Sequence, residues 1–360
     1  MSLESPVLRF LETIGAHRGE RFGHATAAHF GDPAWEYEAV RRSVGLIDIS
    51  HRGAVRVRGA DRVRFLENML SNRVEDLEAG TGRTATLLTP QGKIVALFRL
   101  LAFPESFLAL LPREGVDALI RGLDPFIILE EVVLEDESLR WGTIHVAGPE
   151  SAKLLSALTG SPMPHLPPGH SRSLSFPGLA EAVLAVRDCP TGEDGFDLLA
   201  PREKAAELWK VLLSSGSPKP FPVGLDPFDI LRVEAGTPVF GRDVGLDLGP
   251  LEAGLDEAIS FDKGCYPGQE VVAKTRHRGK PPKRLIGLKI DGEHLPAPGA
   301  AVLMGEAEVG RVTSAVRSPH LGGIVALAVV RTSAIEKGEP LRARTGGGDA
   351  PAEIAETPFR

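Results

Sequence analysis

Short stretches of alternating apolar and polar residues, separated by glycine and proline, run along the whole chain. They predict many short strands and helices rather than a few long helices. Residues 54–58 alternate like a half-buried strand, and Gly59-Ala-Asp61 is expected to open a helix with its apolar side chains on one face. Residues 84–89 and 93–103 are expected to form two strands joined by a turn at Pro90-Gln91-Gly92.

A second segment repeats the first. Residues 144–155 match residues 55–66 position by position: strand, glycine, acidic residue, then a helix with matched apolar positions. The repeat predicts two related α+β units, each a small sheet with helices on one face. We place the first unit at residues 1–142 and the second, which includes the cysteine motif described below, at residues 143–280.

The pattern changes after Pro281-Pro282 to short strands separated by glycine turns. Evenly spaced strands of this kind predict a small C-terminal β-barrel over residues 281–360. The strands are expected at 284–290, 301–304, 310–315, 324–330 and 341–344.

Composition agrees with a folded globular protein, because 42% of the 360 residues are hydrophobic and 25% are charged. The longest apolar run, residues 322–330, is too short to span a membrane, and the N-terminus lacks a secretion signal. Only two cysteines occur, Cys189 and Cys265. We therefore expect a cytoplasmic protein in a reducing compartment, with no membrane partner.

The net charge of −7 argues against a nucleic-acid-binding protein overall, but one segment is strongly basic. This run is either a solvated loop or a site for a polyanion such as a polyglutamate tail or RNA phosphates. Its cations are Lys274, Arg276, Arg278, Lys280, Lys283 and Arg284.

The basic run follows an unusual motif, Lys263-Gly-Cys-Tyr-Pro-Gly-Gln-Glu270. Pro267-Gly268 is typical of a type II turn, so a turn rather than a helix is expected to present Cys265 near the surface. Lys263 and the neighbouring cations favour the thiolate form, which is the nucleophilic form. The alternative is a buried cysteine that acts as a small apolar residue.

Two further motifs contain charged groups between glycines. Thr191-Gly-Glu-Asp-Gly-Phe-Asp197 predicts a tight loop that can aim one carboxylate into a pocket, where it can accept two parallel N–H bonds from a guanidine-like group. The alternative is a solvated acidic turn. A helix is expected from about Asp226 to a glycine C-cap at Gly236, and Arg232 and Glu234 can form a surface pair on it.

These motifs together resemble a known family. The cysteine motif is similar to the signature of the YgfZ family of folate-binding iron–sulfur maintenance proteins. The rest of the chain, from about residue 40 to residue 344, resembles the wider superfamily of the glycine-cleavage T-protein, or aminomethyltransferase. The matching segments are Asp48-Ile-Ser-His51, Thr191-Gly-Glu-Asp-Gly195, Arg232-Val-Glu-Ala-Gly236 and Gly310-Arg-Val-Thr-Ser314.

The resemblance implies a ring of three domains, two related α+β units and a C-terminal barrel, around a central tetrahydrofolate channel. It implies that Glu193 grips the pterin, with Arg232 and Gln269 as further cofactor-binding residues. Cys265 and Lys263 are the residues expected to carry chemistry, and no resident metal site is predicted.

One departure separates the two branches of the superfamily. Where the T-protein has paired aspartates after a glycine turn, this chain has Ala96 and Leu97. The leading hypothesis is therefore a tetrahydrofolate-binding accessory protein for iron–sulfur cluster assembly or repair, with iron–sulfur proteins or assembly factors as partners. The alternative is a folate-dependent aminomethyltransferase or demethylase, which needs a base or orienting carboxylate in the channel. A third hypothesis is a module that supports tRNA modification through the basic run.

Overall fold

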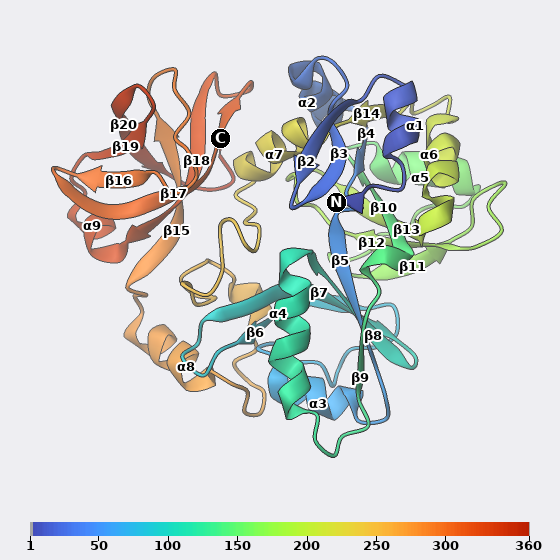
Figure 1. Ribbon diagram of the computed structural model, residues 1–360, viewed down its shortest axis with the longest axis horizontal. Coiled ribbons are helices and arrows are strands. Elements are labelled where there is room, and N and C mark those ends of the chain that lie inside the picture. The colour runs from blue at the N-terminus through green and yellow to red at the C-terminus, as the bar shows by residue number, and fades with distance from the viewer. Residues whose placement is uncertain (1–2, 360) are drawn as a thin grey trace.

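The computed structural model describes residues 3–359, apart from the side chain of Arg278. Figure 1 shows three units arranged around a centre: two that contain helices and open sheets, and a barrel at the C-terminal end of the chain. This is the α+β ring with a terminal barrel that the sequence predicts. No helix within the described residues is long and apolar enough to cross a membrane.

One α+β unit contains a six-stranded sheet in the order β11-β12-β13-β10-β4-β14. Its pairs are antiparallel except for β14 with β4, which is parallel. The strands are β4 (Gly45–Asp48), β10 (Trp141–Ala147), β11 (Ser171–Leu174), β12 (Val183–Arg187), β13 (Gly195–Pro201) and β14 (Phe221–Val223). A small sheet of β1 (Leu3–Glu4), β2 (His17–Arg21) and β3 (His24–His29) accompanies it. The helices are α1 (Leu8–Thr13), α2 (Pro33–Arg42), α5 (Ser151–Thr159), α6 (Ala205–Leu213) and α7 (Leu225–Glu234).

The other α+β unit contains a five-stranded sheet in the order β6-β7-β8-β5-β9. The strands are β5 (Arg52–Arg58), β6 (Gly82–Leu88), β7 (Ile94–Phe103), β8 (Ser106–Pro112) and β9 (Val133–Asp136), and the helices are α3 (Arg62–Met69) and α4 (Glu114–Leu123). The expected hairpin is β6 and β7, joined at the predicted turn. Short 3₁₀ helices cover Asp124–Phe126, Ser138–Arg140, Arg202–Lys204 and Asp256–Ala258.

The C-terminal barrel is closed by six strands in the order β15-β18-β17-β16-β19-β20. They are β15 (Lys283–Ile290), β16 (Ala301–Met304), β17 (Ala307–Ser318), β18 (Gly323–Arg331), β19 (Leu341–Thr345) and β20 (Gly348–Ala355), with α9 (Thr332–Lys337) after β18. The five predicted strands are present. The sixth, β20, was not predicted, because Pro351 and its charged neighbours interrupt the alternation that marks a strand.

The internal repeat is confirmed. In each copy, a central strand, β5 or β10, has two antiparallel neighbours and leads through a glycine to a helix. Gly59 and Gly148 have φ of +108° and +130°, a conformation that other residues rarely adopt. A Cβ atom would lie 1.8 Å from the Glu131 carbonyl oxygen at Gly59 and 2.3 Å from that of Ser43 at Gly148. Both copies therefore need glycine at this point.

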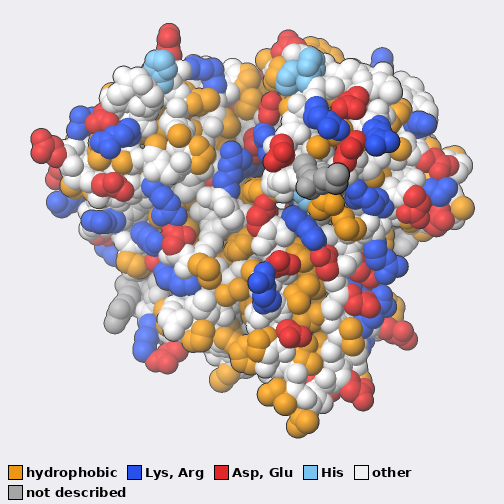
Figure 2. All heavy atoms as spheres, in the orientation of Figure 1, with side chains coloured by type: hydrophobic (Ala, Val, Ile, Leu, Met, Phe, Trp, Pro, Cys, Tyr) orange, Lys and Arg blue, Asp and Glu red, His pale blue; other side chains and the backbone are white. Residues whose placement is uncertain are grey.

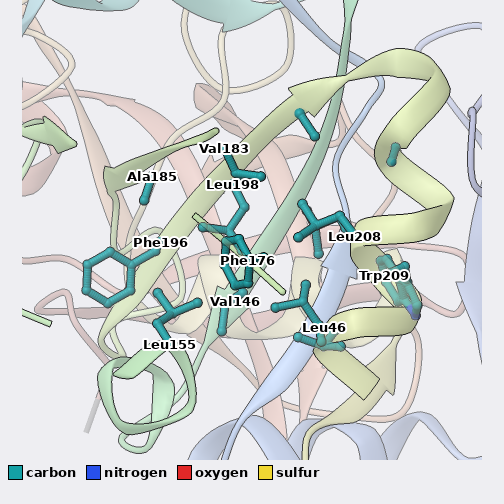
Figure 3. Packing of buried hydrophobic residues seen from close by; sticks show 14 of the residues in the cluster. Leu46, Val146, Leu155, Phe176, Val183, Ala185, Phe196, Leu198, Leu208 and Trp209 are labelled. Carbon is teal, nitrogen blue, oxygen red and sulfur yellow. The ribbon is translucent and has the colours of Figure 1, made fainter. Parts of the chain in front are cut away.

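A large cluster of buried apolar side chains lies between the six-stranded sheet and α5 and α6 (Figure 3). Val146 and Leu198 from the sheet belong to this cluster together with Leu155, Leu208 and Trp209 from the helices. Each fully buried side chain of this size stabilises the fold by roughly 1.5–3 kcal/mol. The adjacent residue Ala147 belongs to a different cluster, with α2 and α7. This sheet is thus covered by helices on both faces, not on one as expected.

Strand pairing also differs from the expected division of the chain. β4 lies in the segment assigned to the first unit but pairs with β10 of the second. Conversely, the Ser260 N–H donates to the Ser71 carbonyl, and the Ile94 N–H donates to the Leu248 carbonyl. The expected boundary at residues 142 and 143 therefore runs through one sheet, and the segment that leads into the cysteine motif packs on the five-stranded unit.

Candidate functional site

A cavity of about 230 Å³ lies where the two α+β units meet α7 and the loop that follows it. Much of its wall is apolar and aromatic, and includes Phe22, Leu97, Phe98, Phe228 and Phe240. Phe22 has φ of +51°, which is rare for a bulky residue and places strain in the backbone at this wall. An apolar cavity with a few charged groups is the usual form of a small-molecule site.

Charged groups gather in two clusters on the cavity wall. In the first, Arg99 donates to Asp188 at 2.9 Å, and Arg52 lies between Asp188 at 3.5 Å and Asp197 at 3.1 Å. Behind them, Asp197 bonds His145 Nδ1 at 2.7 Å. Burial opposes ionisation of Asp197, but the charge of Arg52 and the bond to His145 outweigh it and hold the pKa of Asp197 below its usual value. Asp188 is thus held at the cavity wall between two arginines.

In the second cluster, Asp229 on α7 lies between three arginines. Arg21, Arg232 and Arg242 approach its carboxylate at 3.3, 2.9 and 3.1 Å. Burial again opposes ionisation, and the charges of Arg232 and Arg242 outweigh it, so the pKa of Asp229 is lowered. Two carboxylates held by arginines therefore face one apolar cavity.

His51 lies between these clusters on the cavity wall and is buried. Burial lowers the pKa of His51 to about 3, and the nearby Arg52 acts in the same direction. The ring is therefore neutral near pH 7. Its Nδ1 atom is buried and has no hydrogen-bond partner among the described residues, as expected for a group that a bound ligand would satisfy.

Arg232 lines this cavity, as a cofactor-binding residue should, but it is not part of a surface pair. It is 1% exposed, because Asp243 accepts from its Nη1 and Ser314 of the barrel accepts from its Nη2, both at 2.8 Å. Nε donates to Asp229. Most of its N–H groups are thus already bonded, and Arg232 fastens α7 to the barrel.

Glu193 is in the tight loop that the sequence predicts, but it does not line the cavity. One of its carboxylate oxygens accepts from Arg41 at 2.8 Å, while Arg41 also donates to the buried Glu234 at 2.5 Å. The other oxygen, Oε2, has no partner among the residues described, and the side chain is 25% exposed. Glu193 lies three residues after Pro190, which does line the cavity, so the same loop reaches both places.

The cysteine motif lies apart from the cavity. Cys265 is exposed and precedes the Pro267-Gly268 turn, as predicted, and α8 (Gln269–Arg278) begins immediately afterwards. Lys263, by contrast, is fully buried and donates to the carbonyls of Leu70 and Asn72 at 2.8 and 2.7 Å. Burial lowers the pKa of Lys263. Its ammonium group therefore anchors the segment, and a role of Lys263 in chemistry at Cys265 stays a prediction.

The remaining predicted residues lie near this motif. Gln269 bonds the Lys263 carbonyl at 3.5 Å and does not line the cavity. The basic run extends from α8 through the connection to the barrel into the start of β15, so most of it is not a loop. Lys274, Lys280 and Lys283 pair with Glu270, Glu336 and Asp247. The Arg278 side chain lies outside the described structure. In the part of the chain that the structure describes, no three His, Cys, Asp or Glu side chains gather as a metal site.

Comparison with known proteins identifies the fold and the family. Residues 7–263 match the GCVT N-terminal domain, and residues 283–360 match the glycine cleavage T-protein C-terminal barrel domain. The chain belongs to the glycine cleavage T-protein family. Figure 1 thus shows the arrangement of a T-protein, and the crystal structure of aminomethyltransferase T from Bartonella henselae has the same fold, with a TM-score of 0.88 over 100% of this chain and 98% of that one, at 24% identity.

Curated relatives of the T-protein family match over nearly the full length. The aminomethyltransferase of Shouchella clausii is 30% identical over 99% of this chain and 97% of its own, and that of Bacillus velezensis is 31% identical over 100% and 98%. These relatives support the predicted membership of this chain in the wider aminomethyltransferase superfamily. The YgfZ branch, which rests on the Cys265 motif, stays a prediction.

Proposed function

We propose that this T-protein homologue binds tetrahydrofolate in the central cavity and transfers a one-carbon unit to it from an aminomethyl donor. The observation that carries the proposal is the Asp188 carboxylate. With Leu97 at the expected position, β7 supplies no carboxylate to the cavity. Arg99 lies two residues further along β7 and therefore on the same face of the sheet, and it pairs with Asp188 at the cavity. The carboxylate that the alternative hypothesis requires is thus supplied by another loop.

The residues of the cavity fit a pterin. Its flat heterocycle suits the aromatic wall formed in part by Phe22, Phe98 and Phe228, and its guanidine-like N–H groups suit carboxylate acceptors. Tetrahydrofolate supplies a nitrogen that accepts the one-carbon unit. Asp188 and Asp229 are positioned by their arginines to accept hydrogen bonds, while the apolar wall limits water. Glu193 does not line the cavity, but it follows Asp188 and Pro190 on the same loop, so its carboxylate is expected to contact a part of the folate that extends beyond the cavity wall.

The test combines binding and turnover. Calorimetry with tetrahydrofolate should show binding to the wild-type protein and to Asp188→Asn, which keeps an oxygen to accept from Arg99. Methylenetetrahydrofolate and ammonia should form from an aminomethylated carrier with the wild-type protein, and about a hundredfold more slowly with Asp188→Asn, since a positioned carboxylate contributes about that factor or more. Absence of binding, or equal rates for the two proteins, would refute the proposal.

A second candidate function, as an accessory protein for iron–sulfur cluster assembly or repair, is supported by the exposure of Cys265. A thiol in an open turn is accessible to a partner protein, whereas a structural cysteine is usually buried. A single cysteine cannot complete the four ligands of a cluster, so this role needs a partner that supplies the others. It is tested by complementation with Cys265→Ser in cells that lack the protein. Normal iron–sulfur enzyme activity with the variant would exclude it, and a tRNA-linked role would require salt-dependent tRNA binding.

A further inference from the structure

The connection between α4 and β9 exposes large apolar side chains at one end of the molecule. Phe126, Ile128 and Leu129 are 53%, 80% and 92% exposed. Figure 2 shows hydrophobic side chains gathered at the lower end of the molecule, where Figure 1 places this connection. We refer to residues 124–131 as the acidic tip. Adjacent exposed apolar side chains of this size are typical of an interaction surface.

The acidic tip is built by specific hydrogen bonds. The Glu130 carboxylate accepts from the N–H groups of Ile128 and Leu129 at 3.0 and 3.1 Å. The Glu131 N–H donates to Asp61 at 2.9 Å, and its carbonyl closely approaches Gly59. The apolar side chains are therefore held outward in a defined conformation, which lowers the entropic cost of binding.

The charged residues of the segment that carries the tip all have one sign. Residues 122–139 contain six Asp and Glu residues and no Lys, Arg or His. The three closest to the end of this segment are paired with arginines. Asp124, Glu130 and Glu131, in the tip, form no ion pair with any described residue, so the apolar side chains have an acidic rim.

A groove elsewhere on the surface has the complementary character. It has a volume of about 460 Å³ and lies between α8, the connection to the barrel and α9. Leu251, Pro281 and Ile335 form its apolar part. Its charged residues are Arg276, Lys280, Arg284, Asp256 and Glu336.

The cations of this basic groove are only partly neutralised. Lys280 pairs with Glu336 at 2.7 Å. Arg276 lies over the Phe261 ring, and neither Arg276 nor Arg284 forms an ion pair with a described residue. Two exposed guanidinium groups of the groove therefore lack a carboxylate partner. Only one carboxylate of the groove, Asp256, lacks a cation partner among the described residues.

We propose that the acidic tip of one copy of this chain docks into the basic groove of a second copy. The apolar side chains of the tip match the apolar part of the groove, and the acidic rim matches Arg276 and Arg284. The tip and α8 both lie toward the lower side of the ring in Figure 1, which allows a two-fold axis to use the contact twice. Stable interfaces bury about 1,600 Å² in total, so each of two equal contacts needs about half of that area.

The oligomeric state tests this proposal. Sedimentation velocity over a wide range of concentration should show a wild-type dimer that weakens as salt is raised. Leu129→Asp and Arg284→Glu should each be monomeric, while Leu295→Asp, at a half-exposed leucine of the barrel unit, should remain dimeric. Circular dichroism and unchanged tetrahydrofolate affinity establish that each variant is folded.

A mixture gives the most specific result. Equimolar Leu129→Asp and Arg284→Glu should form a heterodimer, because the intact tip of one variant meets the intact groove of the other. A wild-type monomer at every concentration would overturn the proposal. So would dimers of Leu129→Asp or Arg284→Glu. Because the mixed dimer keeps only one of the two contacts, it should be weaker than the wild-type dimer, and a mixture that associates no more than either variant alone at the highest concentration would also overturn the proposal.

Discussion

Replacing Glu193 with glutamine tests whether the loop around this residue contributes to folate binding. The substitution removes the charge and keeps the shape. Glu193 Oε2 is free to accept a charge-assisted hydrogen bond, and loss of such a bond costs about 1.5–3 kcal/mol. This corresponds to a roughly ten- to hundredfold weaker affinity for tetrahydrofolate, measured by calorimetry.

The fold should tolerate Glu193→Gln. Arg41 keeps its bond to Glu234, and the amide oxygen of glutamine can still accept from it. The Arg41–Glu193 pair is about a quarter exposed, so its loss should lower the free energy of unfolding by no more than about 1 kcal/mol. Asp194→Asn is the matched control, because Asp194 lies in the same loop and also pairs with an arginine, Arg187, but is half exposed. Unchanged affinity in Glu193→Gln, or an equal loss in Asp194→Asn, would refute the reasoning.

Three further predictions concern stability and the thiol. Arg232→Met should lower the free energy of unfolding by about 3–5 kcal/mol in a denaturant titration, because it leaves Asp243 buried without its cation, and a loss below about 1 kcal/mol would contradict this. The pKa of Asp229 is lowered in the fold, so its stabilisation is present above the unfolded value of about 3.9 and is lost as pH falls further. The destabilisation caused by Asp229→Asn should therefore be constant from pH 7 to about 5 and shrink below about 4, and a difference independent of pH would exclude this coupling. Cys265 should be alkylated faster than the partly buried Cys189, as measured by mass spectrometry with a thiol reagent, and equal rates would indicate that Cys265 is not the accessible thiol.

The architecture was predictable where its signals are local. The strand-glycine-helix repeat and five of the barrel strands follow from alternation and turn residues within a few positions of one another. The pairing of β4 with β10 joins residues almost one hundred positions apart, and no local pattern records it. For this reason the boundary between the α+β units was misplaced.

The candidate site was less predictable than the fold. Glu193 and Cys265 stand out because glycines surround them in distinctive motifs. Asp188 and Arg99 do not stand out, because in the sequence each resembles an ordinary surface charge. The cavity that they line forms only when elements distant in the sequence pack together. The burial of Arg232 could not be foreseen for the same reason, because its partners Asp243 and Ser314 come from a distant loop and from the barrel.

The crystal structure of the protein with tetrahydrofolate is the most direct test of the central claim. The pterin is predicted to lie in the cavity between the α+β units and α7, with a ring N–H group within hydrogen-bond distance of the Asp188 or Asp229 carboxylate. His51 Nδ1 is predicted to gain a hydrogen-bond partner. A folate bound outside this cavity, with no folate atom within hydrogen-bond distance of Asp188 or Asp229, would contradict this placement.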